Sequence, residues 1–178
     1  EPADKLLERI LKERKEKWEA EQIANFKAKG KIPPKNWQNK YKEPTPPDTS
    51  KLPELPEGWV WCKLAQVTEL ITKGSSPRWQ GFDYVDKGIM FIRSQNVGWG
   101  ELTISDVAHL SKDFNKKQKK SILKSGDVLL NIVGASIGRA AIATEETENA
   151  NINQAVALIR LFKNALSNTF LMNYLISA

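Results

Sequence analysis

The chain is nearly devoid of the residues that most often carry catalysis, with one cysteine, Cys62, and one histidine, His109. A single cysteine excludes an internal disulfide and a thiolate zinc site. Cys62 lies between Trp61 and Lys63 in an alternating stretch, so we expect a buried core thiol and not a nucleophile. His109 has no serine or cysteine that the sequence pairs with it, which favours a structural or partly exposed imidazole over a general base.

Long apolar runs are also missing. None approaches the roughly 18 residues of a membrane-spanning helix, and no signal peptide is visible from Glu1. With a single cysteine, these features predict a reducing, cytoplasmic compartment.

Motifs for cofactors and metals are absent as well. Asp83, Asp86 and Asp106 do not have metal-ligand spacing. The segment 134–138, Gly-Ala-Ser-Ile-Gly, lacks the lysine and the spacing of a Walker loop. Neither a glycine-rich fingerprint for a methyl donor nor an Asn-Pro-Pro-aromatic motif for base methylation occurs. We therefore expect no catalytic residue, no metal site and no self-contained enzyme.

Charge is modestly positive, with a formal net charge of +6. Residues 1–58 carry 13 basic and 11 acidic side chains, and residues 59–178 carry 14 and 10. The surplus in the second part could attract phosphates, or it could serve solubility alone.

The first 57 residues divide into a helix and a linker. A 3.6-residue apolar period predicts a helix over 4–29 that stops near Gly30, with Leu6, Leu7, Ile10, Leu11, Trp18 and Phe26 on one face. Such a narrow stripe indicates either a partner helix, as in a coiled coil, or a solvated helix lying on its own domain. Seven of the nine prolines fall in 31–57, which predicts an extended connector that Trp37 and Tyr41 could hold against a neighbouring surface.

From Gly58 onward the apolar period becomes that of strands. We expect strands at 59–64, 68–72, 89–93, 127–133, 139–143 and 155–162. A helix or helical turn is expected within 111–124, and a final helix at 168–177 capped by Ser167. The predicted fold class is α+β, a mixed or antiparallel sheet domain between two helical pieces.

Two loops and a glycine turn concentrate side chains that can read DNA. Arg can fork onto guanine, Gln or Asn onto adenine, and Ser or Lys can contact phosphate. The candidate residues are Lys73, Ser75, Ser76, Arg78 and Gln80 in the first loop, Arg93, Ser94, Gln95 and Asn96 in the second, and Ser136 and Arg139 at the turn. The loops could equally be polar for solubility, and the turn could be a purely structural hairpin.

A lysine-rich run follows between residues 112 and 124. It suits contact with the phosphate backbone, with Lys116, Lys117, Lys119 and Lys120 as the candidates. A solvated face is the alternative interpretation of these lysines.

Several segments together resemble one family. They are Leu-Pro-Glu-Gly-Trp at 55–59, Gly-Ser-Ser-Pro at 74–77 (similar to a Gly-x-Thr-Pro segment, with Ser76 in place of Thr), Gly-Ile-Met-Phe-Ile at 88–92, and Gly-Asp-Val-Leu-Leu at 126–130 leading to Gly134 and Gly138. In this order they resemble a target-recognition domain of the DNA-specificity subunit of type I restriction-modification systems. The helix at 6–18 resembles the central spacer helix of that family, and 173–177 resembles the start of the distal one.

The resemblance implies a non-catalytic subunit that reads one half of a bipartite target in double-stranded DNA. It implies a spacer helix (1–30), a linker (31–57), a target-recognition domain (58–165) and the start of a distal spacer helix (166–178). Methyltransferase subunits carrying S-adenosylmethionine and restriction subunits using ATP would be the partners, with no cofactor on this chain. A lone fragment would need the missing half or a second copy, which the N-terminal helix could bring together.

Two rival hypotheses belong to other classes. In one, the chain is a protein-interaction adaptor whose helix docks a partner while the domain only scaffolds it. In the other, it is a stand-alone methyltransferase, which the missing motifs argue against.

Overall fold

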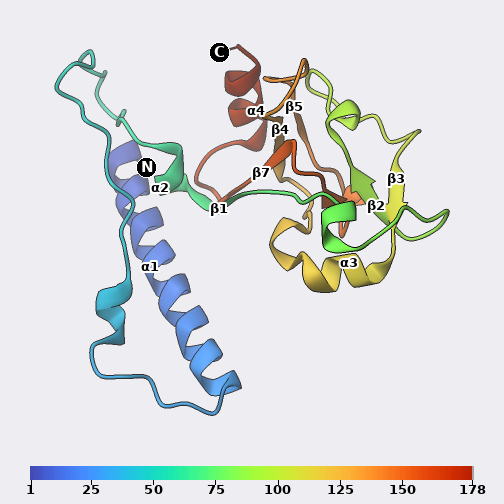
Figure 1. The fold of residues 1–178 in the computed structure, drawn as a ribbon. Helices are drawn as coiled ribbons and strands as arrows, with labels where there is room; N and C mark the ends of the chain where they lie inside the picture. Colours follow the sequence, from blue (N-terminus) through green and yellow to red (C-terminus); the bar gives the residue numbers. More distant parts are fainter. Residues whose placement is uncertain (178) are drawn as a thin grey trace. The chain divides into compact units, whose positions relative to one another are not determined.

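The computed structural model describes residues 1–177 and contains two compact units, residues 1–69 and residues 70 onward (Figure 1). The first contains helix α1 (Ala3–Ala28), a 3-10 turn (Trp37–Lys40) and the short helix α2 (Leu64–Val67). The second contains two β-sheets and helices α3 (Lys112–Lys117) and α4 (Asn168–Ser177). The predicted α+β class is confirmed. The two units divide after residue 69, later than the start of the target-recognition domain expected at residue 58. The expected ranges of the spacer helices, the linker and the target-recognition domain stay predictions.

The linker of the first unit runs back along α1, as Figure 1 shows. Trp37 stacks on Trp18, with ring centroids 5.7 Å apart and an interplanar angle of 25°. Tyr41 packs against the same indole at 5.4 Å, and Phe26 meets Trp37 edge-on at 6.1 Å. The apolar stripe of α1 therefore packs on its own linker, and the expectation that Trp37 and Tyr41 hold the linker is confirmed.

The expected strand at 59–64 is wrong. This segment is extended but has no strand partner in the described chain, and it leads into α2. The segment bonds to the linker instead: the Trp61 indole N–H donates to the Pro53 carbonyl at 3.1 Å, and the backbone N–H of Trp59 donates to the Pro56 carbonyl at 3.2 Å. Packing against the linker has replaced a hydrogen-bonded ladder.

The expectation of a buried thiol at Cys62 is also wrong, because the residue is exposed. Without a sheet, alternation no longer directs every second side chain into a core. Partial desolvation by its neighbours raises the pKa of the Cys62 thiol, so the unreactive protonated form dominates at neutral pH.

Seven strands form the two sheets of the second unit. The four-stranded sheet has the order β1 (Thr68–Lys73), β7 (Val156–Leu161), β4 (Val128–Asn131), β5 (Ala140–Ile142). The three-stranded sheet has the order β3 (Ala108–Leu110), β2 (Ile89–Ile92), β6 (Asn151–Ile152). Strand β4 is antiparallel to β5 and β7, whereas β2 is antiparallel to β3 and parallel to β6. Five predicted strands are confirmed; β3 and β6, of three and two residues, were missed.

A buried ion pair ties the central strands together. The Arg160 guanidinium of β7 donates to both oxygens of Asp127 at 2.7 and 2.6 Å, and Asp127 also accepts the Lys124 N–H at 2.8 Å. Forked geometry of this kind compensates the desolvation of a carboxylate that is only 2% exposed. The neighbouring core contains Leu129, Leu158 and other fully buried apolar side chains.

Both predicted helical pieces of the second unit are present. Helix α3 continues into a 3-10 turn at Lys119–Ser121. Ser111 occupies the N-cap position of α3 but makes no side-chain capping bond. Helix α4 begins as expected, because the Ser167 hydroxyl accepts the Phe170 N–H at 3.3 Å, and it packs against β4 and β5 (Figure 1).

Asn131, at the end of β4, is a buried polar residue that joins two loops. Its side-chain amide donates to the carbonyls of Ser94 at 2.8 Å and Val97 at 3.4 Å. Its backbone N–H donates to the carbonyl of Arg139 at 2.9 Å, directly before β5. The loop after β2 and the loop after β4 are therefore held at one residue.

Replacement of Trp37 by alanine should loosen the linker from α1. Its two ring contacts are worth about 0.5–1.5 kcal/mol each beyond the area that they bury, so we expect the first unit to lose about 1–3 kcal/mol of stability. Urea unfolding followed by near-ultraviolet circular dichroism measures this loss. Trp59→Ala is the control, because Trp59 is 69% exposed and no ring pairs with it in residues 1–177. Equal effects of both substitutions would contradict the packing described here.

Replacement of Asn131 by alanine should leave two loop carbonyls without their donor. Such a loss typically costs about 1–3 kcal/mol when the site is buried, and Asn131 is only 1% exposed. We expect a lower urea midpoint and faster amide hydrogen exchange over residues 93–100. The exposed Gln95→Ala should leave both readouts unchanged, and a wild-type midpoint for Asn131→Ala would refute the role assigned to this amide.

Candidate nucleic-acid interface

The segment Ile152–Val156, which connects β6 to β7, is the point where three loops meet. Its backbone hydrogen bonds are Ser75 N–H to Ile152 O (3.3 Å), Gly74 N–H to Val156 O (3.3 Å), Ile132 N–H to Ala155 O (2.9 Å) and Asn153 N–H to Ile92 O (3.0 Å). Ile92 is the last residue of β2, directly before the loop that follows this strand. We call residues 73–80 the first loop, 93–100 the second and 132–139 the third. The three candidate DNA-reading segments therefore leave the sheets beside one another.

The first loop approaches this segment closely at Gly74. A Cβ atom on Gly74 would lie 1.8 Å from the Ile152 carbonyl oxygen, so only glycine fits without backbone movement. Within the loop, the Gln80 amide donates to the Ser75 hydroxyl at 3.0 Å. Lys73 and Arg78 are exposed, whereas Ser75, Ser76 and Gln80 are half-buried. The Arg78 side chain is thus accessible, whereas the Gln80 amide is already engaged.

The second loop begins with a 3-10 turn, Ser94–Asn96, that the buried side chain of Asn96 stabilises. Asn96 is buried, and its amide accepts the Arg93 N–H and donates to Thr103, both at 2.9 Å. The Arg93 guanidinium donates to the Asp106 carbonyl at 3.0 Å. Ser94 is half-buried and Gln95 is exposed. The structure gives Asn96 the role of holding the loop, and it leaves Gln95 accessible.

The third loop is the predicted turn between two antiparallel strands. Gly134 and Gly138 have φ angles of +82° and +90°, which L side chains rarely adopt. A Cβ on Gly138 would lie 3.9 Å from the Trp99 ring, so the second and third loops are in contact. Ser136 accepts the Arg139 N–H at 3.2 Å, and both side chains are half-buried.

The lysine run contacts the first loop through one residue. The Lys117 ammonium donates to the Gln80 carbonyl at 2.8 Å and lies 5.9 Å from the Phe82 ring centroid. Lys116 pairs with Asp113 at 2.7 Å, a hydrogen bond that raises the pKa of Lys116. Lys119 and Lys120 are exposed on the 3-10 turn that follows α3.

Other kinds of site find little support in the described chain. Residues 1–177 contain no group of three His, Cys, Asp or Glu side chains able to hold a metal. None of their helices is long and apolar enough to cross a membrane. His109 is half-buried in β3, opposite Met90 of β2.

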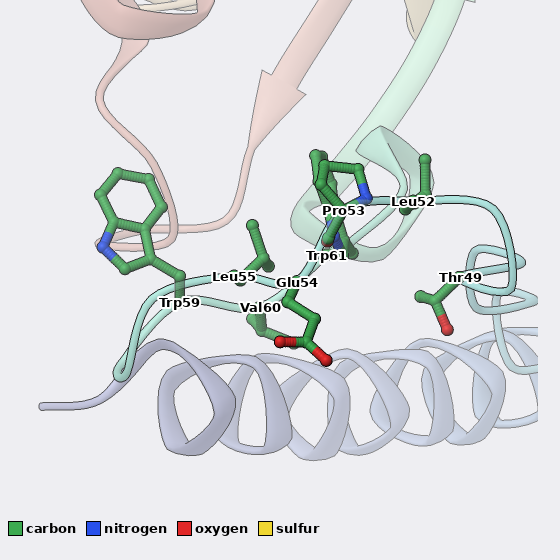
Figure 2. A pocket seen from close by; sticks show the side chains of 8 residues that line it. All are labelled: Thr49, Leu52, Pro53, Glu54, Leu55, Trp59, Val60 and Trp61. Atoms are coloured by element: carbon green, nitrogen blue, oxygen red, sulfur yellow. The ribbon is translucent and has the colours of Figure 1, made fainter.

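The first unit has an open pocket of about 390 Å³ between two stretches of the linker region. Figure 2 shows its lining side chains, which come from residues 49–55 and 59–61. They are largely apolar, and Glu54 is the one charged residue among them. The pocket therefore offers no constellation for acid–base chemistry.

Two structural features of the interface were missed from the sequence. Asn131 lies in the predicted strand, but nothing in a single sequence distinguishes a buried amide at a strand end from an exposed one. The segment Ile152–Val156 was divided between a loop and a strand, and its bonds are to residues at least 20 positions earlier. A polar Asn-Ile-Asn-Gln run directly before an apolar strand was the available signal.

Comparisons with known proteins give one consistent result, although no family model matches. The chain is 30% identical over 180 residues to the type I restriction enzyme EcoAI specificity subunit of Escherichia coli, covering 98% of this chain and 27% of that protein. The MjaVIII specificity subunit of Methanocaldococcus jannaschii is 27% identical over 132 residues, covering 72% of this chain and 30% of that protein. The chain thus spans less than a third of the length of these two relatives.

The fold has solved counterparts. The HsdS subunit from Thermoanaerobacter tengcongensis matches 98% of this chain with a TM-score of 0.54 and 20% identity, over 38% of its own length. A chain from a structure describing assembly of the type I R-M system matches 97% with the same TM-score and 21% identity. The similarity to the EcoAI subunit extends over nearly the whole chain, so the chain resembles a segment of the type I restriction enzyme specificity subunits.

Proposed function

We propose that this chain recognises one half of a bipartite sequence in double-stranded DNA and performs no catalysis itself. The observation that carries the proposal is the convergence of the three loops on the segment Ile152–Val156. Loops held together by a rigid sheet framework can present several side chains to adjacent base pairs. The names of the relatives, which are specificity subunits, support the same function.

The chemistry of the exposed side chains fits direct readout in the major groove. Arg78 can donate in a fork to guanine, and Gln95 can pair with adenine through its amide. Arg139, which is half-buried beside the glycine turn, adds a third candidate. Lys119 and Lys120 can neutralise phosphates and so contribute affinity without selecting a sequence.

Helix α1 is the proposed docking element for methyltransferase subunits, with restriction subunits joining the assembly. S-adenosylmethionine and ATP would be bound by those partners and not by this chain. The helix retains an apolar side chain, Ile23, that is 50% exposed. The same helix could instead pair with a second copy of the chain, which would complete a two-part DNA target.

A protein-interaction adaptor is the alternative function. It keeps the docking role of α1 and removes direct readout from the loops. Binding to DNA by the complex with its methyltransferase subunit distinguishes the two.

The first prediction concerns the wild-type chain, co-expressed with its adjacent methyltransferase subunit and incubated with a randomised duplex pool. We expect enrichment of a short motif, and binding that weakens linearly with the logarithm of salt concentration. Sequencing of the bound fraction at several salt concentrations measures both. A stable complex that enriches no motif would support the adaptor instead.

The second prediction separates readers of bases from binders of phosphate. Arg78→Ala or Gln95→Ala should cost about 1–3 kcal/mol and relax the preference at one position of the motif. Lys119→Ala should weaken all sequences alike and lower the salt slope by about 1. Competition binding with matched and single-mismatch duplexes compares the variants. Equal losses on both duplexes for Arg78→Ala and Gln95→Ala would contradict their assignment as readers.

A further inference from the structure

The turn between β6 and β7 has a side chain that the DNA-reading candidates above do not include. Gln154 is exposed at the tip of this turn. Among residues 1–177, nothing accepts from or donates to its amide. The exposed side-chain amide of Gln154, which lies among the three loops, therefore does not stabilise the fold through a hydrogen bond.

Both neighbours of Gln154 are fixed in place. Asn153 donates its N–H to Ile92 at 3.0 Å, and its side-chain oxygen accepts the Ala155 N–H at 3.1 Å. Ala155 in turn accepts the Ile132 N–H at 2.9 Å. An Asn side chain that bonds the backbone two residues on is a common device for holding a turn. The Cα of Gln154 is therefore held between the end of β2, where the second loop begins, and the third loop.

The first loop lies against the same turn. A Cβ on Gly74 would be 1.8 Å from the Ile152 carbonyl oxygen and 2.5 Å from that of Asn153. No side chain can stand between the first loop and the turn at this point. A DNA duplex that contacts all three loops would therefore pass over Gln154.

We propose that Gln154 reads a base edge at the centre of the interface and that Asn153 is its positioning residue. This inference rests on the proposed function. A glutamine amide both donates and accepts, which suits the N6 and N7 groups of adenine in the major groove. Gln80 and Asn96 have the same chemistry, but their amides are engaged within the protein.

The test uses the chain in complex with its methyltransferase subunit and the randomised duplex pool. Gln154→Ala should lose discrimination at one motif position by about 5- to 150-fold, the equivalent of one good bidentate contact, and leave the other positions unchanged. Gln38→Ala is the matched control, because Gln38 is an exposed glutamine on the 3-10 turn of the first unit. Gln154→Glu keeps the length of the side chain and should move the preference at that position from adenine toward cytosine, since a carboxylate only accepts.

Asn153 is tested by rescue. Asn153→Ala should reduce discrimination at the same motif position, because the Ala155 N–H loses its acceptor. Asn153→Asp retains an oxygen at that place and should restore most of the discrimination. A purely structural role of Asn153 would change the urea midpoint without favouring one motif position.

The outcomes separate the inference from the function on which it rests. If the wild-type complex enriches no motif, the proposed function fails. If it enriches a motif that Gln154→Ala and Gln154→Glu leave unchanged, the inference is overturned and the function stands. A uniform loss on all sequences at an unchanged urea midpoint would assign Gln154 to the phosphate backbone and also overturn base readout.

Discussion

The arrangement of the interface depends on the close backbone contact between Gly74 and the turn after β6. A side chain at residue 74 would occupy the place of the Ile152 carbonyl oxygen. Because there is none, the Gly74 and Ser75 N–H groups reach the carbonyls of Val156 and Ile152. This contact brings the first loop to the segment that also bonds to Ile92, at the end of β2, and to Ile132, the first residue of the third loop.

The meeting of three loops follows from the connection between the two sheets. Strand β6 pairs with β2 in the three-stranded sheet, and β7 pairs with β1 and β4 in the other. The short turn between β6 and β7 therefore passes from one sheet to the next. Loops that follow β1, β2 and β4 all begin beside their pairing partners, so they emerge around this turn. Neither sheet alone would bring the three together.

Much of this framework could be predicted from the sequence, because apolar runs and helix signals act locally. The runs at 89–93, 127–133 and 155–162 form strands, and Ser167 begins α4 as expected. The strand at 59–64 failed because alternation specifies faces only when a ladder partner exists, and here the linker took that place. Strands β3 and β6 are too short to form a periodic pattern, and they exist because β2 lies between them.

The residue types of the candidate site could be predicted from the sequence. Which of their side chains are hydrogen-bonded within the protein, and which remain accessible, could not. From the sequence alone, Gln80, Gln95 and Asn96 are equivalent candidates, since each amide can read adenine. The structure engages Gln80 with Ser75 and buries Asn96 under its own loop, which leaves Gln95 exposed. Which amide is engaged depends on contacts that no local pattern encodes.

The polar side chains of the interface fall into two groups: buried ones that hold the loops and exposed ones that face solvent. Asn96 and Asn131 are buried with their donors bound to loop carbonyls, so substitution there disturbs loop geometry. Arg78 and Gln95 are exposed and contribute little to folding, since surface substitutions away from such contacts usually change stability by less than about 0.5 kcal/mol. A recognition surface built in this way can change the sequence that it reads at the exposed positions while the buried amides keep the loops in place.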